Sequence, residues 1–258
     1  MRLEPKASAA GVRLVAHDVL GSTNAEALKL ARSGERGPLW VVARRQTAGR
    51  GRRGRTWISE PGNLYATLLL SAPGPAEHWP ELSFVAALAI YDAVVEVAAA
   101  FAPRLAIKWP NDLLLAGKKF AGILIEAENA GGEGAVAVGI GVNCASHPAA
   151  TDHPATDLAA AGAPCSPETL FAALAVNMLG RLAQWNGGTG FAAIRADWLA
   201  HAAGLGEDVR VRLPERELVG RFEALDRRGA LVLRLPDGGA TTVAVGDVFV
   251  LSSPLAAS

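Results

Sequence analysis

The middle of the chain alternates short apolar runs with turn residues, and this density of strand signals constrains the fold more than any other feature. Leu105–Trp109 and Leu113–Leu115 have the apolar character of buried strands. Ala116–Lys118 is typical of a hairpin turn, and a glycine-rich turn at Gly131–Gly134 leads into another apolar run, 135–143. Strands that follow one another this closely predict an antiparallel or mixed sheet.

Helices are predicted on both sides of this region. A Thr23-x-x-Glu26 capping box is expected to begin the first, and Ser166-Pro167 has the cap and first-turn residues typical of another. The predicted helices cover residues 24–34, 80–101, 166–185 and 191–203, and two further strands cover 39–44 and 64–70. Together these elements favour an α+β fold, with helices packed on a mixed or antiparallel sheet.

After Gly204 the pattern changes to short alternating strands separated by turn residues. This pattern predicts a small all-β unit of the SH3-like barrel type. We therefore expect two domains, a main domain of residues 1–204 and a small domain of residues 205–258. The Gly-x-Gly motifs do not open helices, so the sequence does not indicate a Rossmann-type nucleotide-binding unit.

Composition argues against a general binder of polyanions. Half of the 258 residues are apolar, and 25 basic residues balance 25 acidic ones, so the formal net charge is zero. A nucleic-acid-binding protein usually carries a basic excess over a whole face. Neither a signal peptide nor a membrane span is evident, and Cys144 and Cys165 are too few for a disulfide scaffold or a zinc cluster. We expect a cytoplasmic protein with two ordinary thiols.

The stretch RRQTAGRGRRGRTW (Arg44–Trp57) holds six arginines, three glycines and no acidic residue. Glycines let successive backbone N–H groups form an anion-binding nest, and arginines add forked donors. The stretch therefore predicts a loop that binds a phosphate or a carboxylate. A solvated basic loop, or an arm that touches nucleic acid, is the alternative. Trp57 can stack on a base or serve as a partly buried anchor.

A lysine stands among apolar residues in IKWPNDLLL (Ile107–Leu115). Because lysine is rarely buried without a partner, Lys108 either reaches solvent or points into a site that holds an anion. Asn111 and Asp112 follow a proline and form a structural turn in one interpretation. In the other, they orient the lysine or hold a metal ion.

Two further stretches place polar groups beside glycines. In GIGVN (139–143) the glycines indicate either close approach of a ligand or tight strand packing, and Asn143 offers an amide to a ligand. In GSTN (21–24) the hydroxyls are expected to cap the following helix. The histidines follow no metal-ligand spacing, so we interpret them as surface or structural residues: His17, His78, His147, His153 and His201.

Taken together, in this order and spacing, GSTN, QTAGRGRRGRTW, KWPNDLLL…KKFAGILIE and GIGVN resemble the biotin protein ligase family. The all-β unit after Gly204 is similar to the small C-terminal domain of these enzymes. Because the first motif begins at Gly21, the chain resembles the monofunctional form without an N-terminal DNA-binding domain. The resemblance implies two steps. The carboxylate of biotin attacks the α-phosphorus of ATP, and a lysine of a carrier domain then attacks biotinyl-5′-AMP and releases AMP.

The resemblance also implies which residues meet each ligand. Lys108 and Arg52 are the implied catalytic cations. The implied biotin-binding residues are Ser22, Thr23, Asn24, Gln46, Gly49, Arg50, Gly51, Arg52, Lys108, Gly122 and Gly141. The implied nucleotide-binding residues are Arg52, Arg55, Trp57, Lys108, Lys119 and Asn143. Asp112 is implied to organise Lys108 or the magnesium ion that accompanies ATP, and no side-chain cluster indicates a separate metal site.

The implied acceptor is the biotin carboxyl carrier domain of acetyl-CoA carboxylase, with no DNA or membrane partner, and both a monomer and a homodimer stay open. The repelling arginines and flexible glycines predict a loop that is mobile in the empty enzyme and closes over the adenylate. A lipoate or octanoate ligase or transferase of the same fold family is one alternative, disfavoured by GRGRRG and KWPND. A nucleic-acid-binding protein is the other, disfavoured by the zero net charge and the absence of a recognition-helix module.

Overall fold

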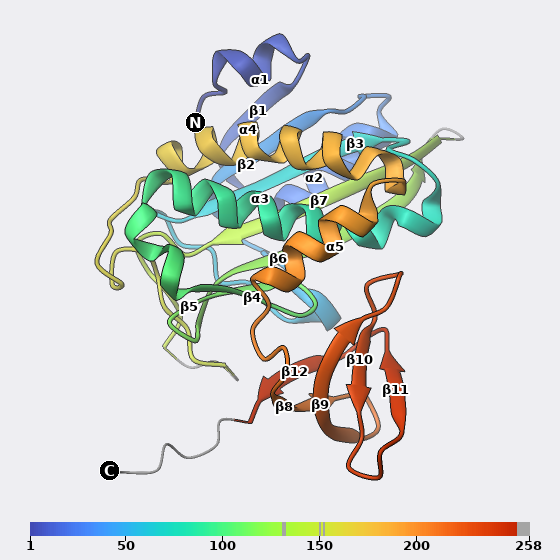
Figure 1. The fold of residues 1–258 in the computed structure, drawn as a ribbon. Helices are drawn as coiled ribbons and strands as arrows, with labels where there is room; N and C mark the ends of the chain where they lie inside the picture. Colours follow the sequence, from blue (N-terminus) through green and yellow to red (C-terminus); the bar gives the residue numbers. More distant parts are fainter. Residues whose placement is uncertain (131–132, 150, 152, 252–258) are drawn as a thin grey trace.

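A seven-stranded sheet forms the centre of the main body (Figure 1). The computed structural model describes residues 1–130, 133–149, 151 and 153–251. The strands are β1 (Arg13–Leu20), β2 (Leu39–Gln46), β3 (Leu64–Ser71), β4 (Leu105–Lys108), β5 (Asp112–Leu115), β6 (Lys118–Ala130) and β7 (Glu133–Val142). Their order is β1-β2-β3-β7-β6-β5-β4. Only the β1–β2 pair is parallel among these strands, which confirms the predicted mixed sheet.

The hairpin between β5 and β6 forms where the turn residues predict it. Ala116 and Gly117 both have positive φ angles, 49° and 75°, and reverse the chain between β5 and β6. The predicted glycine turn before β7 falls partly on residues 131–132, which lie outside the described residues. In the β6–β7 pairing Gly122 lies directly opposite Gly141, so two residues without side chains share one place on the same face of the sheet.

Helices cover both faces of the sheet. They are α1 (Pro5–Ala9), α2 (Thr23–Arg32), α3 (Leu82–Val97), α4 (Pro167–Trp185) and α5 (Phe191–Ala200). Helices α3 and α4 pack side by side over one face (Figure 1). Trp40 and Val42 of β2 belong to the same apolar cluster as these helices. Leu39 and Val41 point the other way and pack with α2, as the alternation of side chains along a strand requires.

Two helix predictions need correction. The helix expected over 80–101 is α helical only from Leu82 to Val97, and 3-10 turns over Ala76–Glu81 and Ala99–Arg104 flank it. Each turn contains a proline, which lacks the N–H that an α-helix interior uses. The helix expected to run to residue 203 ends at Ala200. By contrast, Ser166 caps α4 as predicted, because its Oγ accepts a 3.0 Å hydrogen bond from the Thr169 N–H.

The capping box predicted at the start of α2 is wrong. Ser22 occupies the N-cap position, and its hydroxyl makes no capping hydrogen bond; the first N–H of the helix, that of Thr23, instead donates to Gln46 Oε1 on β2. Thr23 lies in the first turn, and its hydroxyl instead contacts Gln46 and Thr67. The hydroxyls of GSTN therefore do not cap the helix, and Ser22 and Thr23 line the cavity described below.

The chain after Gly204 forms a second, five-stranded antiparallel sheet, which confirms the predicted small all-β unit. Its strands are β8 (Asp208–Arg212), β9 (Glu217–Leu225), β10 (Leu231–Arg234), β11 (Ala240–Val243) and β12 (Asp247–Val250). Their order is β11-β10-β9-β8-β12, and the unit lies beside the β4–β5 end of the large sheet (Figure 1). Residues 252–258 of the predicted small domain lie outside the described residues.

Buried contacts join the two units. The indole of Trp109, which is buried, donates a 3.0 Å hydrogen bond to the backbone carbonyl of Gly229 in the β9–β10 turn. Gly229 has a φ of 81°, and a Cβ there would lie 2.7 Å from the Phe84 ring, so the turn packs closely on α3. Both cysteines are free thiols. Within the described ranges, no helix has the length and apolar character needed to cross a membrane.

Candidate active site

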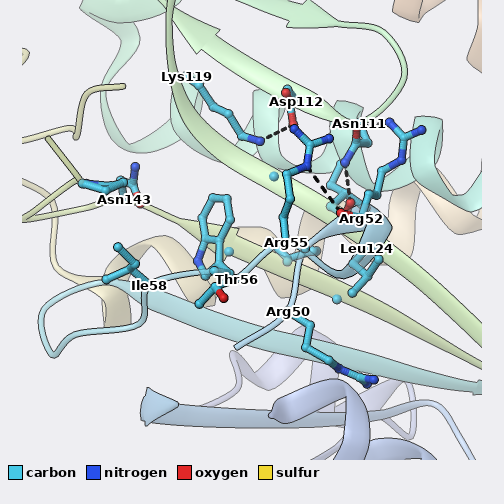
Figure 2. A pocket seen from close by; sticks show the side chains of 18 of the residues that line it. Arg50, Arg52, Arg55, Thr56, Ile58, Asn111, Asp112, Lys119, Leu124 and Asn143 are labelled. Atoms are coloured by element: carbon cyan, nitrogen blue, oxygen red, sulfur yellow. Dashed lines mark hydrogen bonds and ion pairs between the residues drawn. The ribbon is translucent and has the colours of Figure 1, made fainter. Parts of the chain in front are cut away.

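A cavity of about 490 Å³ opens where the large sheet, the arginine loop and the start of α2 meet. Its floor is formed by β6 and β7, and the arginine loop covers one side (Figure 2). One wall residue, Asp247, comes from β12 of the C-terminal unit. The cavity is large enough for a drug-sized ligand and combines apolar walls with a few polar groups, as binding sites usually do.

The arginine loop is a compact turn. Arg50 and Thr56 form an antiparallel bridge, and the Gly51 N–H donates a 2.7 Å hydrogen bond to the Arg55 carbonyl. Gly49 is required for close approach rather than for ligand contact, because a Cβ there would lie 2.4 Å from a backbone oxygen of the returning strand. Gly49 does not line the cavity, whereas Gly51 does.

Two arginines of the loop reach the sheet. Arg50 Nη2 lies 2.8 Å from Glu126 Oε2 on β6. Arg52 Nη1 donates a 2.9 Å hydrogen bond to Asn111 Oδ1 (Figure 2). Burial lowers the pKa of Arg52, yet a guanidinium stays charged at neutral pH. Arg52 is thus a desolvated cation aimed across the cavity at the Pro-Asn-Asp turn.

Arg53 and Arg55, the remaining arginines of the 50–55 segment, reach the C-terminal unit. Arg55 Nη2 lies 3.0 Å from Asp247 Oδ1, and Arg53 Nη1 lies 3.3 Å from Asp247 Oδ2. Asp247 is mostly buried and lines the cavity. One carboxylate of β12 therefore holds two cations of the loop, and the C-terminal unit forms part of the site.

The Trp57 ring lies on Gly122 of β6 and Gly141 of β7, which form the glycine floor of the cavity. A Cβ on Gly141 would lie 2.6 Å from the Trp57 ring, and one on Gly122 would lie 3.0 Å from it. The ammonium of Lys119 lies 5.4 Å from the ring centroid, a cation–π contact. The indole Nε1 is buried and has no hydrogen-bond partner within the described part of the chain. The indole thus offers an aromatic face to the cavity, where a planar ligand can lie.

Asp112 pairs with two lysines beneath the loop. Lys119 Nζ lies 2.6 Å from Asp112 Oδ1, and Lys108 Nζ lies 3.3 Å from Asp112 Oδ2. Burial alone would raise the pKa of Asp112, but the ammonium groups of Lys119 and Lys108 outweigh it and hold that pKa below its ordinary value. Burial lowers the pKa of Lys108, and Asp112 opposes this shift.

The two lysines stand at different depths. Lys119 lines the cavity, whereas Lys108 is only 5% exposed and lies behind Asp112 rather than on the cavity wall. The Lys108 ammonium also lies 3.0 Å from Nε2 of His153. His153 itself lines the cavity, a position that the spacing of the histidines in the sequence did not indicate. Burial, followed by the charge of Lys108, lowers the pKa of His153 to about 4.

Neutral polar groups form the other end of the cavity. The Thr23 backbone N–H and hydroxyl donate hydrogen bonds of 2.8 and 3.1 Å to Gln46 Oε1. Thr67 Oγ1 lies 2.8 Å from the Thr23 hydroxyl and 2.6 Å from Asn24 Oδ1. Asn24 Nδ2 donates a 2.8 Å hydrogen bond to Glu126. Most of these groups can both donate and accept, and they suit a neutral polar ligand.

The side chain of Asn143 closes the cavity beside Trp57. Its Nδ2 donates a 3.1 Å hydrogen bond to the carbonyl of Thr156, and its backbone N–H donates a 2.7 Å bond to that of Phe120. The residue is buried and lines the cavity. Asn143 therefore both fixes the segment after β7 and faces the space above the glycine floor.

The residues present do not fit a resident metal ion. In the described part of the chain, no three His, Cys, Asp or Glu side chains are grouped as metal ligands. Asp112, the carboxylate considered for magnesium, already carries two ammonium groups. These contacts favour the alternative in which Asp112 organises lysines.

The structure brings together all but two of the sequence-predicted binding residues. Those that line the cavity are Ser22, Thr23, Asn24, Gln46, Arg50, Gly51, Arg52, Arg55, Trp57, Lys119, Gly122, Gly141 and Asn143. Gly49 and Lys108 do not. The sequence does not predict His153, Glu126 or Asp247 as site residues, because each joins the site through contacts distant in the chain.

Comparison with known proteins gives the class of this fold and site. The model of the biotin/lipoate A/B protein ligase family matches residues 17–143, and the model of the biotin protein ligase C-terminal domain matches residues 204–251. Among curated proteins, the biotin–[acetyl-CoA-carboxylase] ligase of Paracoccus denitrificans is 48% identical over 238 residues, covering 88% of this chain and 96% of that protein. The chain therefore belongs to the biotin protein ligase family.

Solved structures agree on the fold. The biotin protein ligase from Aquifex aeolicus in complex with biotin and ATP is similar with a TM-score of 0.77 and 24% identity, over 93% of this chain and 99% of that one. The biotin protein ligase from Leishmania major in complex with biotinyl-5-AMP is similar with a TM-score of 0.65 and 28% identity, over 90% and 99%.

Proposed function

We propose that the chain uses ATP to adenylate biotin and then transfers the biotinyl group to a lysine of a biotin carboxyl carrier domain. One observation carries the proposal: a single cavity joins a neutral polar end, at Thr23 and Gln46, to a cationic centre at Arg52 and Lys119. Biotin has the same division, a neutral ureido ring at one end and a carboxylate at the other. The relative from Paracoccus denitrificans is named for this activity.

The neutral end receives the ureido ring. Its carbonyl needs donors and its two N–H groups need acceptors, and Ser22, Thr23, Asn24 and Gln46 supply both kinds without a net charge. The hydrogen bonds among Thr23, Gln46 and Thr67 fix these groups before the ligand arrives. Such preorganisation reduces the ordering cost of binding.

The cationic centre brings two anions together. In the first step, a carboxylate oxygen of biotin forms a bond to the α-phosphorus of ATP, and the bond from that phosphorus to the pyrophosphate oxygen breaks. Repulsion between carboxylate and phosphate is large at low dielectric. Arg52 and Lys119, which are held by the adjacent residues Asn111 and Asp112, offset it, and Asp112 orients Lys119 at 2.6 Å. Magnesium arrives with ATP and neutralises phosphate charge when bound.

The nucleotide base occupies the end of the cavity near Trp57 and Asn143. Trp57 offers an aromatic face, and an indole can stack on a purine. Arg55 lies between this end and the cationic centre, where it can contact phosphate or ribose oxygens once it leaves Asp247. Desolvation strengthens each of these electrostatic contacts.

The second step uses the carrier lysine. Its amine attacks the acyl carbon of biotinyl-5′-AMP, the bond from that carbon to the phosphate oxygen breaks, and AMP leaves as the amide forms. The arginine loop covers the anhydride and excludes water until the carrier arrives. In this proposal residues 1–204 form the ligase domain, and the domain from residue 205 onward contributes Asp247 and closes one wall.

Substrate-dependent exchange of pyrophosphate into ATP tests the proposal. The purified chain is expected to catalyse the exchange with biotin and not with lipoate or octanoate, and then to biotinylate a purified carrier domain at one lysine. Exchange supported by lipoate and not by biotin would reverse the substrate assignment. Absence of exchange with every acid, together with salt-resistant binding to duplex DNA, would favour the nucleic-acid-binding alternative.

A further inference from the structure

His153 is fixed beside the cationic centre by backbone pairing. The residues that follow it add a short parallel bridge to β6: the Lys119 N–H donates a 2.7 Å hydrogen bond to the Pro154 carbonyl, and the Thr156 N–H donates a 2.9 Å bond to the Lys119 carbonyl. Because one of the bridged residues is Lys119 itself, the imidazole and the cavity-facing lysine have fixed relative positions.

The imidazole accepts a hydrogen bond from a buried ammonium. His153 Nε2 lies 3.0 Å from Lys108 Nζ. Asp112 Oδ2 lies 3.3 Å from the same ammonium, and the centroid of the Phe249 ring lies 6.0 Å from it. An ammonium only donates, so Nε2 uses its lone pair and the ring is neutral. Lys108 is only 5% exposed, and a buried ammonium needs a hydrogen-bond acceptor for each of its N–H groups.

The C-terminal unit holds the opposite face of the same ring. Phe249 of β12 stacks on His153 with the ring centroids 4.3 Å apart and the planes 21° apart. The guanidinium of Arg212 lies 4.9 Å from the Phe249 centroid and supports the phenyl ring from β8. The imidazole is therefore held by packing on a face and by a hydrogen bond on an edge.

We propose that His153 is a positioning residue for adenylation, which holds the Lys108 ammonium on Asp112 and thereby sets the Asp112–Lys119 pair, while Phe249 keeps the imidazole in place. Without an acceptor at this position, the Lys108 ammonium loses one of its partners, and the orientation of the Asp112 carboxylate that it shares with Lys119 is no longer fixed. Lys119 then loses its fixed orientation toward the reacting carboxylate and phosphate. This inference rests on the proposed function, and it links the C-terminal unit to the reaction by the path Phe249–His153–Lys108.

Three substitutions separate the acceptor from the packing. His153→Phe keeps a stacked ring and removes the acceptor. His153→Gln keeps an acceptor oxygen at similar reach. Phe249→Leu keeps the imidazole and removes both the stack on it and the 6.0 Å contact of the phenyl ring with the Lys108 ammonium. His201→Gln is the matched control, because His201 stacks on Tyr91 at 4.0 Å and does not line the cavity.

The measurement is biotin-dependent ATP–pyrophosphate exchange, with kcat and the KM for biotin determined for each variant. We expect His153→Phe to lower kcat about 10-fold or more, as for loss of one oriented electrostatic group, with KM changed less than about 3-fold because the neutral end is intact. His153→Gln is expected to recover most of the loss, Phe249→Leu to lose an intermediate amount, and His201→Gln to match the parent chain.

Two outcomes overturn the inference: His153→Phe with the kcat of the parent chain, or His153→Gln as slow as His153→Phe. Exchange by the parent chain tests the proposed function separately. Imidazole ¹⁵N spectra at about pH 6 give a second readout that needs no activity, since ordinary histidines are then largely protonated. The signal lost in His153→Gln is expected to belong to a neutral ring with Nε2 unprotonated, and a doubly protonated ring there contradicts the inference.

Discussion

Lys119 and Asp112 form a 2.6 Å ion pair at the wall of the cavity, with Lys108 on the far side of the same carboxylate. Lys108 and Lys119 share one carboxylate but have different positions relative to the cavity. Both ammonium groups keep the carboxylate ionised, Lys119 more than Lys108, and the cavity-facing Lys119 can also meet a ligand anion. Because Asp112 has a pKa below its ordinary value, this arrangement persists at every pH near neutrality.

Arg52 is predicted to retain the adenylate. Its guanidinium is largely desolvated and is held by Asn111 at 2.9 Å, so removing it leaves the intermediate with one cation fewer. For Arg52→Ala we expect dissociation of biotinyl-5′-AMP to be about 10- to 100-fold faster, with the unfolding free energy changed by less than about 1 kcal/mol. Retention of labelled adenylate on a filter measures the rate. Arg227→Ala, at an exposed position, is the control, and equal retention by the two variants would count against the assignment.

Asp247 is predicted to hold the arginine loop when no ligand is present. It contacts both Arg53 and Arg55, so Asp247→Asn removes the charge that offsets their mutual repulsion. We expect trypsin to cleave the 50–55 segment several-fold faster in this variant than in the parent chain. Biotin with ATP is expected to protect both proteins.

The loop experiment has two controls, a second variant of the C-terminal unit and the parent chain without ligands. Glu215→Gln changes an exposed acidic residue of the same unit and is expected to leave cleavage unaltered. Cleavage of the parent chain at one rate with and without ligands would show that the loop does not close over the adenylate.

His153 makes the unfolding free energy depend on pH in a defined direction. Its folded-state pKa is about 4, below the ordinary value of about 6.5. The unfolded chain therefore binds a proton first as the pH falls, and the stability that His153 contributes above about pH 6.5 is lost progressively towards pH 4. Urea unfolding across this range is expected to show a steeper loss for the parent chain than for His153→Gln. The other titrating groups are common to both chains, so parallel curves would contradict the prediction.

Gly141 is predicted to keep the floor open for Trp57. A methyl group there would lie 2.6 Å from the indole, so Gly141→Ala must displace the ring. We expect the KM for ATP in the exchange reaction to rise about 10-fold, equivalent to about 1.4 kcal/mol. Gly180→Ala, in α4 with no atom within 4 Å of the added Cβ, is the control. An unchanged KM for ATP in Gly141→Ala would contradict the assignment of Trp57 to nucleotide binding.

The parts of the fold that the sequence predicts are those with local causes. Apolar runs give the strands from β2 to β7, and the cap at Ser166 needs only Thr169, three residues away. The capping box at Thr23 fails because its hydroxyl has competing partners at Gln46 and Thr67, which only the folded sheet brings near. Local patterns do not register such competition.

The site, like the fold, is predictable where contiguous motifs define it and not where distant contacts do. The glycine–arginine loop and the Lys-Trp-Pro-Asn-Asp turn are contiguous motifs, and the resemblance they carry places most of the cavity residues. The partner of Arg55 is 192 residues away, in a different sheet. A lone acidic residue such as Asp247, or a lone histidine such as His153, carries no spacing that separates it from surface residues. The depth difference between Lys108 and Lys119 also depends on side-chain direction in the folded sheet.

The most direct test of the cationic centre compares two adjacent lysines. Lys119 lines the cavity on Asp112, whereas Lys118 is exposed. In single-turnover formation of biotinyl-5′-AMP, Lys119→Gln is expected to be slower than the parent chain by about 100-fold or more, and Lys118→Gln by less than about 2-fold. Formation of the adenylate by Lys119→Gln at the rate of Lys118→Gln would contradict the account.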